Sequence, residues 1–438
     1  MGSDLITRPL EECLDALIDY RGKTPKKVSS GVPLITAKVV KSGRIELPNE
    51  FIAEADYATW MTRGYPEVGD IVLTTEAPLG EVAQIKYLPV ALAQRIVTLR
   101  GKEGVLDNNY LLYLLQSSQM QEKLIGRSTG TTVVGIKQSE LRKVEVTLPP
   151  IAEQRAISHI LSTIDDKIEL NLQMNKTLEE MAHTLFKAWF VDFEPVRAKM
   201  EGRWQANQSL LGLPSDLYDL FPSRLVESEL GLIPEGWEHV PANKLIEFNP
   251  SEPLRKGTEA PYIEMASLPT TGYWPKHPVL RPFGSGMRFR NGDTLLARIT
   301  PCLENGKTAF IQCLPDNSVG WGSTEYIVMR TKAPVPSEFG YLLARDDTFR
   351  AQAIRSMTGT SGRQRVQADS VASFMLASPL NNGVWDAFSK IIVPMFESIT
   401  ANSQTIETLN QLRSSLLPKL IAGELRVSDT DSIVGVDV

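Results

Sequence analysis

The sequence has few cysteines and no long hydrophobic run. Its three cysteines, Cys13, Cys302 and Cys313, show no C-x-x-C spacing, which argues against a disulfide framework and against a cysteine-rich metal site. No apolar stretch approaches the roughly 20 residues that a membrane-spanning helix needs, and the acidic, interrupted N-terminus "MGSDLITRPLEECLD" is unlike a secretory signal. We therefore expect a cytoplasmic protein.

Catalytic and cofactor-binding motifs are also lacking. "ENGKT" at 304–308 ends like a phosphate-binding loop, but Pro301 stands where the first glycine of such a loop is needed. "PFGSG" at 282–286 lacks the G-x-G-x-x-G spacing of a cofactor turn. "FNPSEP" at 248–253 stops one proline short of the motif with which adenine methyltransferases hold their base. We therefore expect no catalytic residue and no cofactor on this chain.

Metal-binding and nuclease patterns are missing as well. "PDNSVGWGSTEYI" at 315–327 has acidic residues but no lysine two positions after its glutamate, so it is a poor nuclease site. The histidines are scattered without the spacing of metal ligands. They are His159, His183, His239 and His277. We expect no metal on this chain.

The charge balance is acidic, with a net charge of −6. Binding to nucleic acid draws on Lys and Arg, so the distribution of charge matters more than its sum. The acidic excess lies in residues 151–193, 194–235 and 379–438, whereas 1–150 is balanced and 236–378 is slightly basic. The composition therefore leaves DNA binding open for the two larger segments.

The chain carries one internal duplication, which must be recognised before the fold is assigned. Three segments of the first half match three of the second half in the same order. The matched pairs are "GVPLITAKVVKSG" (31–43) with "EAPYIEMASLPTTG" (259–272), "VGDIVLTTEAPLGEVAQI" (68–85) with "NGDTLLARITPCLENGKTAFI" (291–311), and "STGTTVVGI" (128–136) with "MTGTSGRQRV" (357–366). Each half then reaches a proline, Pro149 or Pro379, before a long helical stretch.

Each half mixes strand and helix patterns. "DIVLTT", "RIVTLR", "DTLLAR" and "EYIVMR" are short, β-branched and apolar, as strands are, while "NNYLLYLLQSSQMQEKLIG" and "EFGYLLARDDTFRAQAIRS" have the spacing of amphipathic helices. We therefore predict an α+β fold with two similar domains.

Two long helices follow these domains and keep a strict 4-3-4-3 spacing of mostly apolar positions, which is typical of a coiled-coil seam. The seam positions are Ile157, Leu161, Ile164, Ile168, Asn171, Asn175, Leu178, Ala182, Leu185 and Trp189, then Phe388, Ile392, Met395, Ile399, Asn402, Ile406, Leu409, Arg413, Leu416 and Leu420. Seam amides such as Asn171 and Asn402 would fix the register. Pro394 should kink the second helix or delay its start. Alternatively, each helix packs only on its own domain.

These patterns divide the chain into six predicted segments. They are a first α+β domain (1–150), a central long helix (151–193), a linker (194–235), a second α+β domain (236–378), a C-terminal long helix (379–424) and a tail (425–438).

The chain resembles the specificity subunit of type I restriction-modification enzymes over nearly its whole length. The segments that carry the resemblance are "LPPIAEQRAISHILSTIDDKIELNLQMNKTLEEMAHTLFKAWFVDFEPVRAK" (148–199), "SELGLIPEGWE" (228–238), "GDTLLARITPCLENGKTA" (292–309) and "LLPKLIAGELRV" (416–427). In that family two target-recognition domains each read one half of a split DNA sequence. Two long antiparallel helices hold the domains apart and dock the methyltransferase subunits.

The resemblance implies a non-catalytic subunit that binds double-stranded DNA at a bipartite, asymmetric site. Two methyltransferase subunits would methylate adenine at N6, and restriction subunits would translocate and cut. S-adenosylmethionine, ATP and Mg²⁺ would then be bound by these partners. Half-sites about one helical turn apart would lie on one face of the duplex.

Candidate DNA contacts lie in paired loops and strand ends that combine small hydroxyl residues, a glycine and cations, a combination suited to phosphate contacts, with Gln364 able to read an adenine edge. A further cluster of arginines surrounds two phenylalanines at 281–290. The candidates are Thr74, Thr75, Glu76, Thr129, Gly130, Thr131, Thr132, Lys137, Arg281, Arg288, Arg290, Arg298, Asn305, Lys307, Thr358, Gly359, Thr360, Arg363, Gln364 and Arg365. Alternatively, these segments are structural turns and hairpins with exposed polar tips.

Leu185, Phe186, Trp189 and Phe190 are the candidate contacts with partner subunits, because large apolar residues at a helix end mark contact sites when they are exposed. Alternatively, the Leu, Tyr and Phe residues of 194–235 fold back and cover them.

Two other functions fit the same pattern. One is the recognition subunit of a related system that cuts on both sides of its site. The other is a coiled-coil scaffold whose two α+β modules bind protein or small ligands; DNA binding, unlike apolar contacts, should weaken steeply as salt rises.

Overall fold

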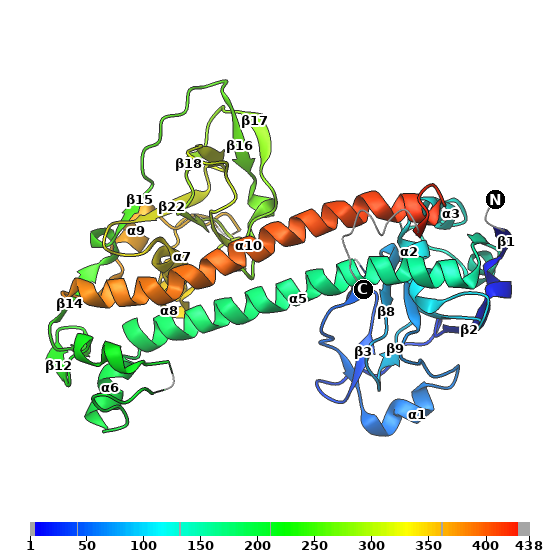
Figure 1. Cartoon of the computed structure of the whole chain (residues 1–438), viewed down its shortest axis with the longest axis horizontal. Helices are drawn as coiled ribbons and strands as arrows, with labels where there is room; N and C mark the ends of the chain where they lie inside the picture. Colours follow the sequence, from blue (N-terminus) through cyan, green and yellow to red (C-terminus); the bar gives the residue numbers. More distant parts are fainter. Residues whose placement is uncertain (1–4, 42, 131–132, 211, 361, 428–438) are drawn as a thin grey trace. The chain divides into compact units, whose positions relative to one another are not determined.

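The computed structural model describes residues 5–41, 43–130, 133–210, 212–360 and 362–427. The chain folds as two units (Figure 1): unit 1 comprises residues 1–169 and 407–438, and unit 2 comprises residues 170–406. Each unit therefore holds one of the α+β domains together with part of each long helix. Of the predicted tail, residues 428–438 lie outside the described part.

Unit 1 contains an antiparallel four-stranded sheet and a smaller three-stranded sheet. Its strands are formed by the apolar and β-branched runs that favour extended backbone. In order across the two sheets they are β2 (Leu14–Asp19), β10 (Ile96–Gly101), β7 (Ile71–Thr75) and β8 (Leu79–Gln84), then β6 (Phe51–Ile52), β3 (Val32–Ile35) and β9 (Ala91–Leu92). β1 (Ile6–Pro9) pairs separately with β11 (Glu145–Leu148), and β4 (Val40–Lys41) with β5 (Arg44–Ile45).

Unit 2 repeats this arrangement. Its main sheet has the order β15 (Ile246–Phe248), β22 (Tyr326–Thr331), β19 (Thr294–Ala297) and β20 (Thr308–Phe310), and its second sheet has β17 (Val279–Pro282), β16 (Glu259–Ile263), β21 (Gly320–Gly322) and β18 (Met287–Phe289). β14 (Trp237–Pro241) pairs with β23 (Met375–Pro379), as β1 pairs with β11. Each second sheet contains one parallel pair of strands, β3 with β9 in unit 1 and β16 with β21 in unit 2. In each pair the later strand follows the antiparallel hairpin of the main sheet, β7–β8 or β19–β20. The prediction of two similar α+β domains is confirmed.

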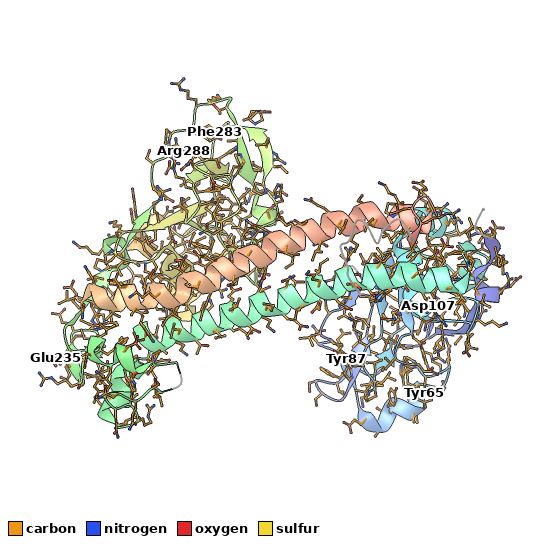
Figure 2. The ribbon with its side chains drawn as sticks, in the orientation of Figure 1. Tyr65, Tyr87, Asp107, Glu235, Phe283 and Arg288 are labelled. Atoms are coloured by element: carbon orange, nitrogen blue, oxygen red, sulfur yellow. The ribbon has the colours of Figure 1, made fainter. Side chains whose placement is uncertain are left out.

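A pair of short helices follows the main sheet in each unit. They are α2 (Asn108–Gln116) and α3 (Ser118–Gly126) in unit 1, and α7 (Ser337–Arg345) and α8 (Asp347–Arg355) in unit 2. An aspartate begins one helix of each pair: Asp107, labelled in Figure 2, accepts hydrogen bonds from the first backbone N–H groups of α2, and Asp346 does the same for α8. Such caps satisfy amides that no helical carbonyl can reach.

A buried aspartate and an arginine lock the same turn in both units, and we call this pair the aspartate clamp. In unit 1, Asp70 accepts hydrogen bonds from Arg100 at 2.8 and 2.9 Å, and in unit 2, Asp293 accepts them from Arg330 at 2.7 and 2.7 Å. Each aspartate is only 1% exposed. The clamp joins the turn before β7 or β19 to the end of β10 or β22, which explains why both halves of the sequence carry Gly-Asp before a strand.

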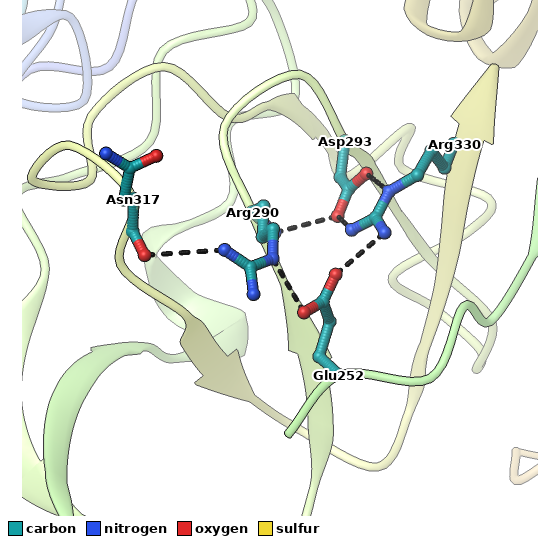
Figure 3. Close-up of polar contacts among 5 residues, drawn as sticks. All are labelled: Glu252, Arg290, Asp293, Asn317 and Arg330. Carbon is teal, nitrogen blue, oxygen red and sulfur yellow. Dashed lines mark hydrogen bonds and ion pairs between the residues drawn. The ribbon is translucent and has the colours of Figure 1, made fainter. Parts of the chain in front are cut away.

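Unit 2 adds a second carboxylate to its clamp (Figure 3). Glu252 accepts hydrogen bonds from Arg330 at 2.7 Å and from Arg290 at 2.6 Å. Burial raises the pKa of Glu252, but the hydrogen bonds from Arg290 and Arg330 outweigh burial, so its pKa is lowered overall. Because an ionised Glu252 faces two guanidinium groups, the side chains of this network neutralise one another.

The long helices are α5 (Ile151–Phe190) and α10 (Asn382–Ile421), each of 40 residues. Figure 1 shows both as continuous helices. α10 begins before Pro394 and runs through it, so the expected delayed start is wrong. Phe388, Ile392 and Phe396 are buried on either side of the proline, and this packing outweighs the backbone hydrogen bond that proline cannot donate.

The two helices pack antiparallel in both units. In unit 2, Phe190 lies against Phe388 with ring centroids 4.9 Å apart, and Asn175 donates to Ser403 at 3.2 Å. In unit 1, Arg413 donates to Asp165 at 2.7 Å. From the first pair to the third, the residue number on α5 falls by as much as the residue number on α10 rises, as expected for antiparallel helices in one register.

The seam amides find partners, as the sequence predicts. Asn402 donates to the side-chain oxygen of Asn175 at 2.9 Å, while Asn175 donates to Ser403. The helices also pack on the domain of their own unit: Gln154 of α5 accepts from the backbone of Asp107 at 3.0 Å, and Tyr273 donates to the carbonyl of Phe396 on α10 at 3.0 Å. The helices therefore pair with each other and also pack on the domain of their own unit, so the alternative in which each helix packs only on its own domain is wrong.

The segment predicted as a linker is folded. It contains α6 (Glu194–Met200) and the hairpin of β12 (Leu225–Ser228) and β13 (Gly231–Pro234). Its buried side chains include Trp204, Leu213 and Phe221, which belong to the core of unit 2. The shorter α-helices are α1 (Tyr57–Trp60), α4 (Gln138–Arg142) and α9 (Ala368–Ala372).

Replacing Asp293 with alanine should lower the free energy of unfolding by about 3 kcal/mol, because the substitution breaks a buried ion pair and frees the turn before β19. The change is measurable as a lower urea midpoint. Asp316→Ala is the matched control, since Asp316 is exposed, and it should change stability by less than about 0.5 kcal/mol. Equal midpoints for the two variants would contradict a structural role for the clamp.

Candidate nucleic-acid interface

Two equivalent loops lie at the ends of the main sheets, and each is closed by a pair of backbone hydrogen bonds. In unit 1 the pair joins Thr129 and Gly135 at 2.9 and 3.0 Å, and in unit 2 it joins Thr358 and Arg365 at 3.0 and 2.9 Å. Thr131 and Thr132, two of the predicted contacts, lie outside the described residues. Thr129, Gly130, Thr358, Gly359 and Thr360 are exposed.

Each loop needs its glycine. Gly130 has φ +110°, and a Cβ there would lie 2.2 Å from the carbonyl oxygen of Val133; Gly359 has φ +124°, and a Cβ would lie 3.1 Å from that of Arg363. Side chains other than glycine rarely adopt this backbone. Around these glycines the described side chains of Thr129, Thr358, Thr360 and Arg363 are exposed.

The loops are fixed to the sheet in the same way in both units, and we call these contacts the loop frame. Ile136 N–H donates to the carbonyl of Thr75 at 3.0 Å, and Val366 N–H donates to that of Arg298 at 2.9 Å. A further bond joins each strand end to its neighbour: Thr75 N–H donates to the carbonyl of Arg95, and Arg298 N–H to that of Glu325, both at 3.0 Å.

Polar side chains gather around the loop frame. In unit 1, Arg95 pairs with Glu76 at 3.2 Å. In unit 2, Arg365 donates to Glu325 at 2.9 Å, and Arg298 donates to Gln367 at 2.7 Å.

Sequence reasoning did not select three of these residues, Arg95, Glu325 and Gln367. The signal available for the first two was that each directly precedes an equivalent strand, "IVTLR" or "YIVMR". Arg365 donates hydrogen bonds to the Glu325 carboxylate, and this contact raises the pKa of Arg365 above its ordinary value. The guanidinium of Arg365 therefore stays charged.

Several predicted contacts are placed elsewhere. Thr74 and Thr75 are 0% and 1% exposed, because they lie inside the sheet on β7, so the prediction that their side chains touch DNA is wrong. Arg290 is bound to Glu252 and to the carbonyl of Asn317 (Figure 3), and Lys307 donates to the carbonyl of Met265 at 2.7 Å. These two cations stabilise the fold of unit 2, which leaves them poorly suited to contact phosphate. Asn305 is exposed.

The second sheet of unit 2 presents two arginines stacked on aromatic rings, and we call this set the arginine–aromatic face. Arg281 lies 4.5 Å from the ring centroid of Tyr262, and Arg288 lies 6.0 Å from that of Phe283. Trp321 contacts both rings, with centroids 4.5 Å from Tyr262 and 5.4 Å from Phe283. Figure 2 labels Phe283 and Arg288 on this part of the unit.

Exposed cations flank the arginine–aromatic face. Arg255 and Lys256 are exposed, and the backbone of the neighbouring Gly257 donates to the carbonyl of Phe283 at 2.8 Å. Within the part of the chain that the structure describes, the ion pairs of unit 2 do not include Arg255, Lys256, Arg281 or Arg288. Such unneutralised positive charge attracts a polyanion.

The equivalent sheet of unit 1 is covered. Leu34 and Ala91 hold the positions of Tyr262 and Trp321 in the parallel strand pair. Both are fully buried in a cluster on which Tyr57 and Trp60 of α1 pack. Among the residues of unit 1 that the structure describes, this sheet therefore has no counterpart of the arginine–aromatic face.

Unit 1 has instead a groove of about 610 Å³ beside its loop. Its lining consists of Leu17, Asp19, Arg21, Arg63, Gln138 and Ser139. Arg21 donates to the carbonyl of Ile136, next to the loop frame, at 2.7 Å. The exposed Lys137 directly precedes α4 there, so the groove and the loop form one polar surface.

The candidate partner contacts are buried within unit 2. Phe186, Trp189 and Phe190 are 3%, 1% and 5% exposed, and Leu185 packs against the same core. Burial therefore contradicts a partner contact for Phe186, Trp189 and Phe190, whereas Leu185 is only partly buried. Sequence reasoning could not place Phe339 and Trp385, far away in the chain, against Phe190 with ring centroids 5.3 and 4.8 Å apart. Phe221 covers Trp189 from the folded 194–235 segment, as the alternative proposed.

Two further properties of the described ranges bear on function. No group of three or more His, Cys, Asp or Glu side chains there could hold a metal ion. None of the described helices is long and apolar enough to span a membrane.

The fold and the surface together define a class of protein: a duplicated recognition protein in which two α+β domains present equivalent loops with different side chains. A family model, described as the type I restriction modification DNA specificity domain, matches residues 18–180. The chain is 29% identical to the type I restriction enzyme MjaIX specificity subunit of Methanocaldococcus jannaschii, over 82% of this chain and 78% of that protein. It is 23% identical to the HindI specificity subunit of Haemophilus influenzae, over 76% and 81%.

A solved structure shares the fold. The crystal structure of the type I restriction-modification system S subunit from M. genitalium matches with a TM-score of 0.56 at 14% identity, over 96% of each chain. The sequence and the fold are thus similar to those of type I restriction-modification specificity subunits, and this similarity supports a role in DNA-sequence recognition. Subunits of this family are not themselves catalytic.

Trp189→Ala should lower the free energy of unfolding by about 3–5 kcal/mol, since it removes a large buried ring from the core of unit 2. Chemical denaturation measures this loss. Met181→Ala serves as the control on the same helix, because Met181 is half exposed, and it should cost much less. A stable Trp189→Ala variant that lost only partner binding would restore the partner-contact interpretation.

Proposed function

We propose that this chain reads a bipartite, asymmetric DNA site, one half with each α+β domain, and directs partner subunits to that site. The observation that supports this most directly is the loop frame, which is repeated bond for bond while the side chains around it differ. A common frame allows both domains to approach DNA in the same way, and different side chains select different bases.

The partners of this proposal are two methyltransferase subunits and restriction subunits. S-adenosylmethionine, ATP and Mg²⁺ would be bound by those partners, which would methylate adenine at N6 and, for restriction, translocate and cut DNA. Because cellular DNA is the substrate, we propose that the complex works in the cytoplasm. The relatives are named as type I specificity subunits, which favours these partners over those of a system that cuts on both sides of its site, and DNA binding over a non-DNA scaffold.

A stripe on α5 is the better candidate for a partner contact within unit 2. Leu170, Met174 and Met181 are 58%, 45% and 50% exposed. Their spacing of four and seven residues places them on one face of the helix. Exposed apolar stripes of this kind suit the packing of a partner helix.

Modification-sensitive long-read sequencing tests the central proposal. DNA from cells that express this chain with its neighbouring methyltransferase subunit should carry methyladenine at a two-part motif with a fixed gap. Cells that lack this chain should carry none. Methylation that is absent, or independent of this chain while the complex still assembles, would show that specificity resides elsewhere.

The arginine–aromatic face should contribute phosphate contacts. We expect the double variant Arg281→Gln, Arg288→Gln to reduce the slope of log affinity against log salt by about 2, since each lost phosphate contact removes about 1. The motif should not change, because phosphate contacts carry no sequence information. Titrations of labelled duplex DNA at several salt concentrations measure the slope.

Arg203→Gln provides the control for this titration. Arg203 is paired with Glu194 and Glu201 in the 194–235 segment, so its loss should leave the slope unchanged. An unchanged slope in the double variant would show that the arginine–aromatic face does not contact DNA.

A further inference from the structure

The duplication allows a direct comparison of side chains at equivalent positions around the loop frame. The backbone hydrogen bonds align Thr75 with Arg298, Arg95 with Glu325, and Gly135 with Arg365. Glu76 aligns with Ile299, because Glu76 forms an isolated bridge with Gly135 and Ile299 forms one with Arg365. Lys137 and Gln367 align as well: each lies two residues after Gly135 or Arg365 and directly precedes a short helix.

Every one of these five positions differs in chemical character between the units, although the backbone bonds agree within about 0.1 Å. The aspartate clamp, at the other end of the same strands, keeps both of its residue types. Side-chain replacement is thus concentrated where the main chain is held most alike. A side chain that only supports the fold is expected to keep its residue type in both units, as the clamp residues do. Side chains that read different ligands are expected to differ between the units while the backbone around them stays the same.

We call the side-chain positions around the loop frame the rim. Unit 2 places two guanidinium groups at the rim, and each donates to an acceptor side chain. Gln367 accepts from one terminal nitrogen of Arg298 at 2.7 Å. Glu325 accepts from Nε of Arg365 with both oxygens at 2.9 Å. Since a guanidinium carries five N–H groups, each arginine keeps further donors. The acceptors fix the planes of the two guanidiniums, which lowers the entropy lost on binding.

The exposure of these groups agrees with a contact role. The Arg365 side chain is 39% exposed and that of Glu325 is 25% exposed, while Arg298 is half-buried. Nε of Arg298 is buried with no hydrogen-bond partner. The arginine is therefore held at a partly closed rim with fewer bonds than it can make.

Unit 1 has no guanidinium at either equivalent position. Thr75 is buried and Gly135 has no side chain, so neither can present donors to a base edge. Instead the rim carries Arg95 paired with Glu76 across the frame. The two domains therefore offer different donor and acceptor patterns on one backbone scaffold.

Bidentate donation from a single guanidinium to O6 and N7 in the major groove is the usual protein contact with guanine. We propose that Arg298 and Arg365, positioned by Gln367 and Glu325, form the base-reading centre of unit 2 and select guanine in the half-site that this unit reads. This proposal rests on the proposed function and adds to it the residues and the base. Arg298 is the main reader, because Arg365 uses more of its donors within the protein.

The test is the methylation motif of the complete complex, determined by modification-sensitive sequencing for the wild type and for Arg298→Gln. Glutamine pairs well with adenine and poorly with guanine. We expect one position of one half-site to lose its preference for guanine by about tenfold or more and to shift toward adenine, with the other half-site unchanged. The unchanged half also reports that the variant is folded and assembled.

Two further variants separate reading from positioning. Glu325→Gln keeps the shape but removes the charge that holds Arg365, so it should relax the same half-site without the shift toward adenine. Arg224→Gln is the matched control: Arg224 also pairs with a glutamate, Glu235, but is exposed and remote in sequence from the loop frame. It should leave the whole motif unchanged.

The outcomes are distinct. Preserved guanine discrimination in Arg298→Gln, at the wild-type motif, would overturn the reading centre while leaving the proposed function intact. A change confined to overall methylation, with no base position altered, would also overturn it and would indicate a phosphate contact or a structural role. A wild-type complex without any two-part motif would remove the proposed function and this inference together.

Discussion

The aspartate clamp is the interaction on which the rest of each recognition domain depends. Asp70 and Asp293 directly precede the strands β7 and β19, and their arginine partners lie near the ends of β10 and β22. Those strands are antiparallel neighbours. The opposite ends of the same strand pairs carry the loop frame, so the clamp fixes the register that presents the rim. A slip of one residue would turn every side chain of β7 or β19 to the opposite face of the sheet.

A buried ion pair is a weak source of net stability, because desolvation offsets much of the attraction between the charges. Its value here lies in specificity of pairing. An aspartate displaced by one position could not meet its arginine in the apolar interior, and the displaced charges would remain unpaired. Unit 2 extends the same solution with Glu252 and Arg290, so that two carboxylates face two guanidinium groups.

Local patterns in the sequence were sufficient to predict the duplication, the α+β class and the long helices. Gly-Asp before an apolar run marks both clamps, and the 4-3-4-3 spacing marks the seam, because both signals depend on neighbouring residues. The burial of Phe186, Trp189 and Phe190 could not be predicted, since their partners Phe339, Trp385 and Phe388 are far away in the sequence. Apolar side chains at a helix end look alike whether a partner or the chain itself covers them.

The candidate site divides in the same way. Glycines and hydroxyl residues of the loops could be found because the loops repeat in composition. Glu325 and Gln367 could not, because a residue that holds an arginine has no local signature. Thr74 and Thr75 were misplaced for a related reason: threonine is common both in loops and inside sheets, and only the pairing of β7 with two neighbours shows which applies.

Net charge is a poor guide to the surface of this protein. Arg100, Arg290, Arg330 and Arg413 are each neutralised by a carboxylate inside the fold. Such pairs remove cations from the surface, so the net charge of the chain does not report where its exposed cations lie. In unit 2, Arg281 and Arg288 lie beside aromatic rings on the second sheet, where unit 1 has a covering helix. Duplication preserved the scaffold, and divergence at the rim and on the second sheet is enough to make the two halves unequal. The asymmetric DNA site of the proposed function would follow from that inequality.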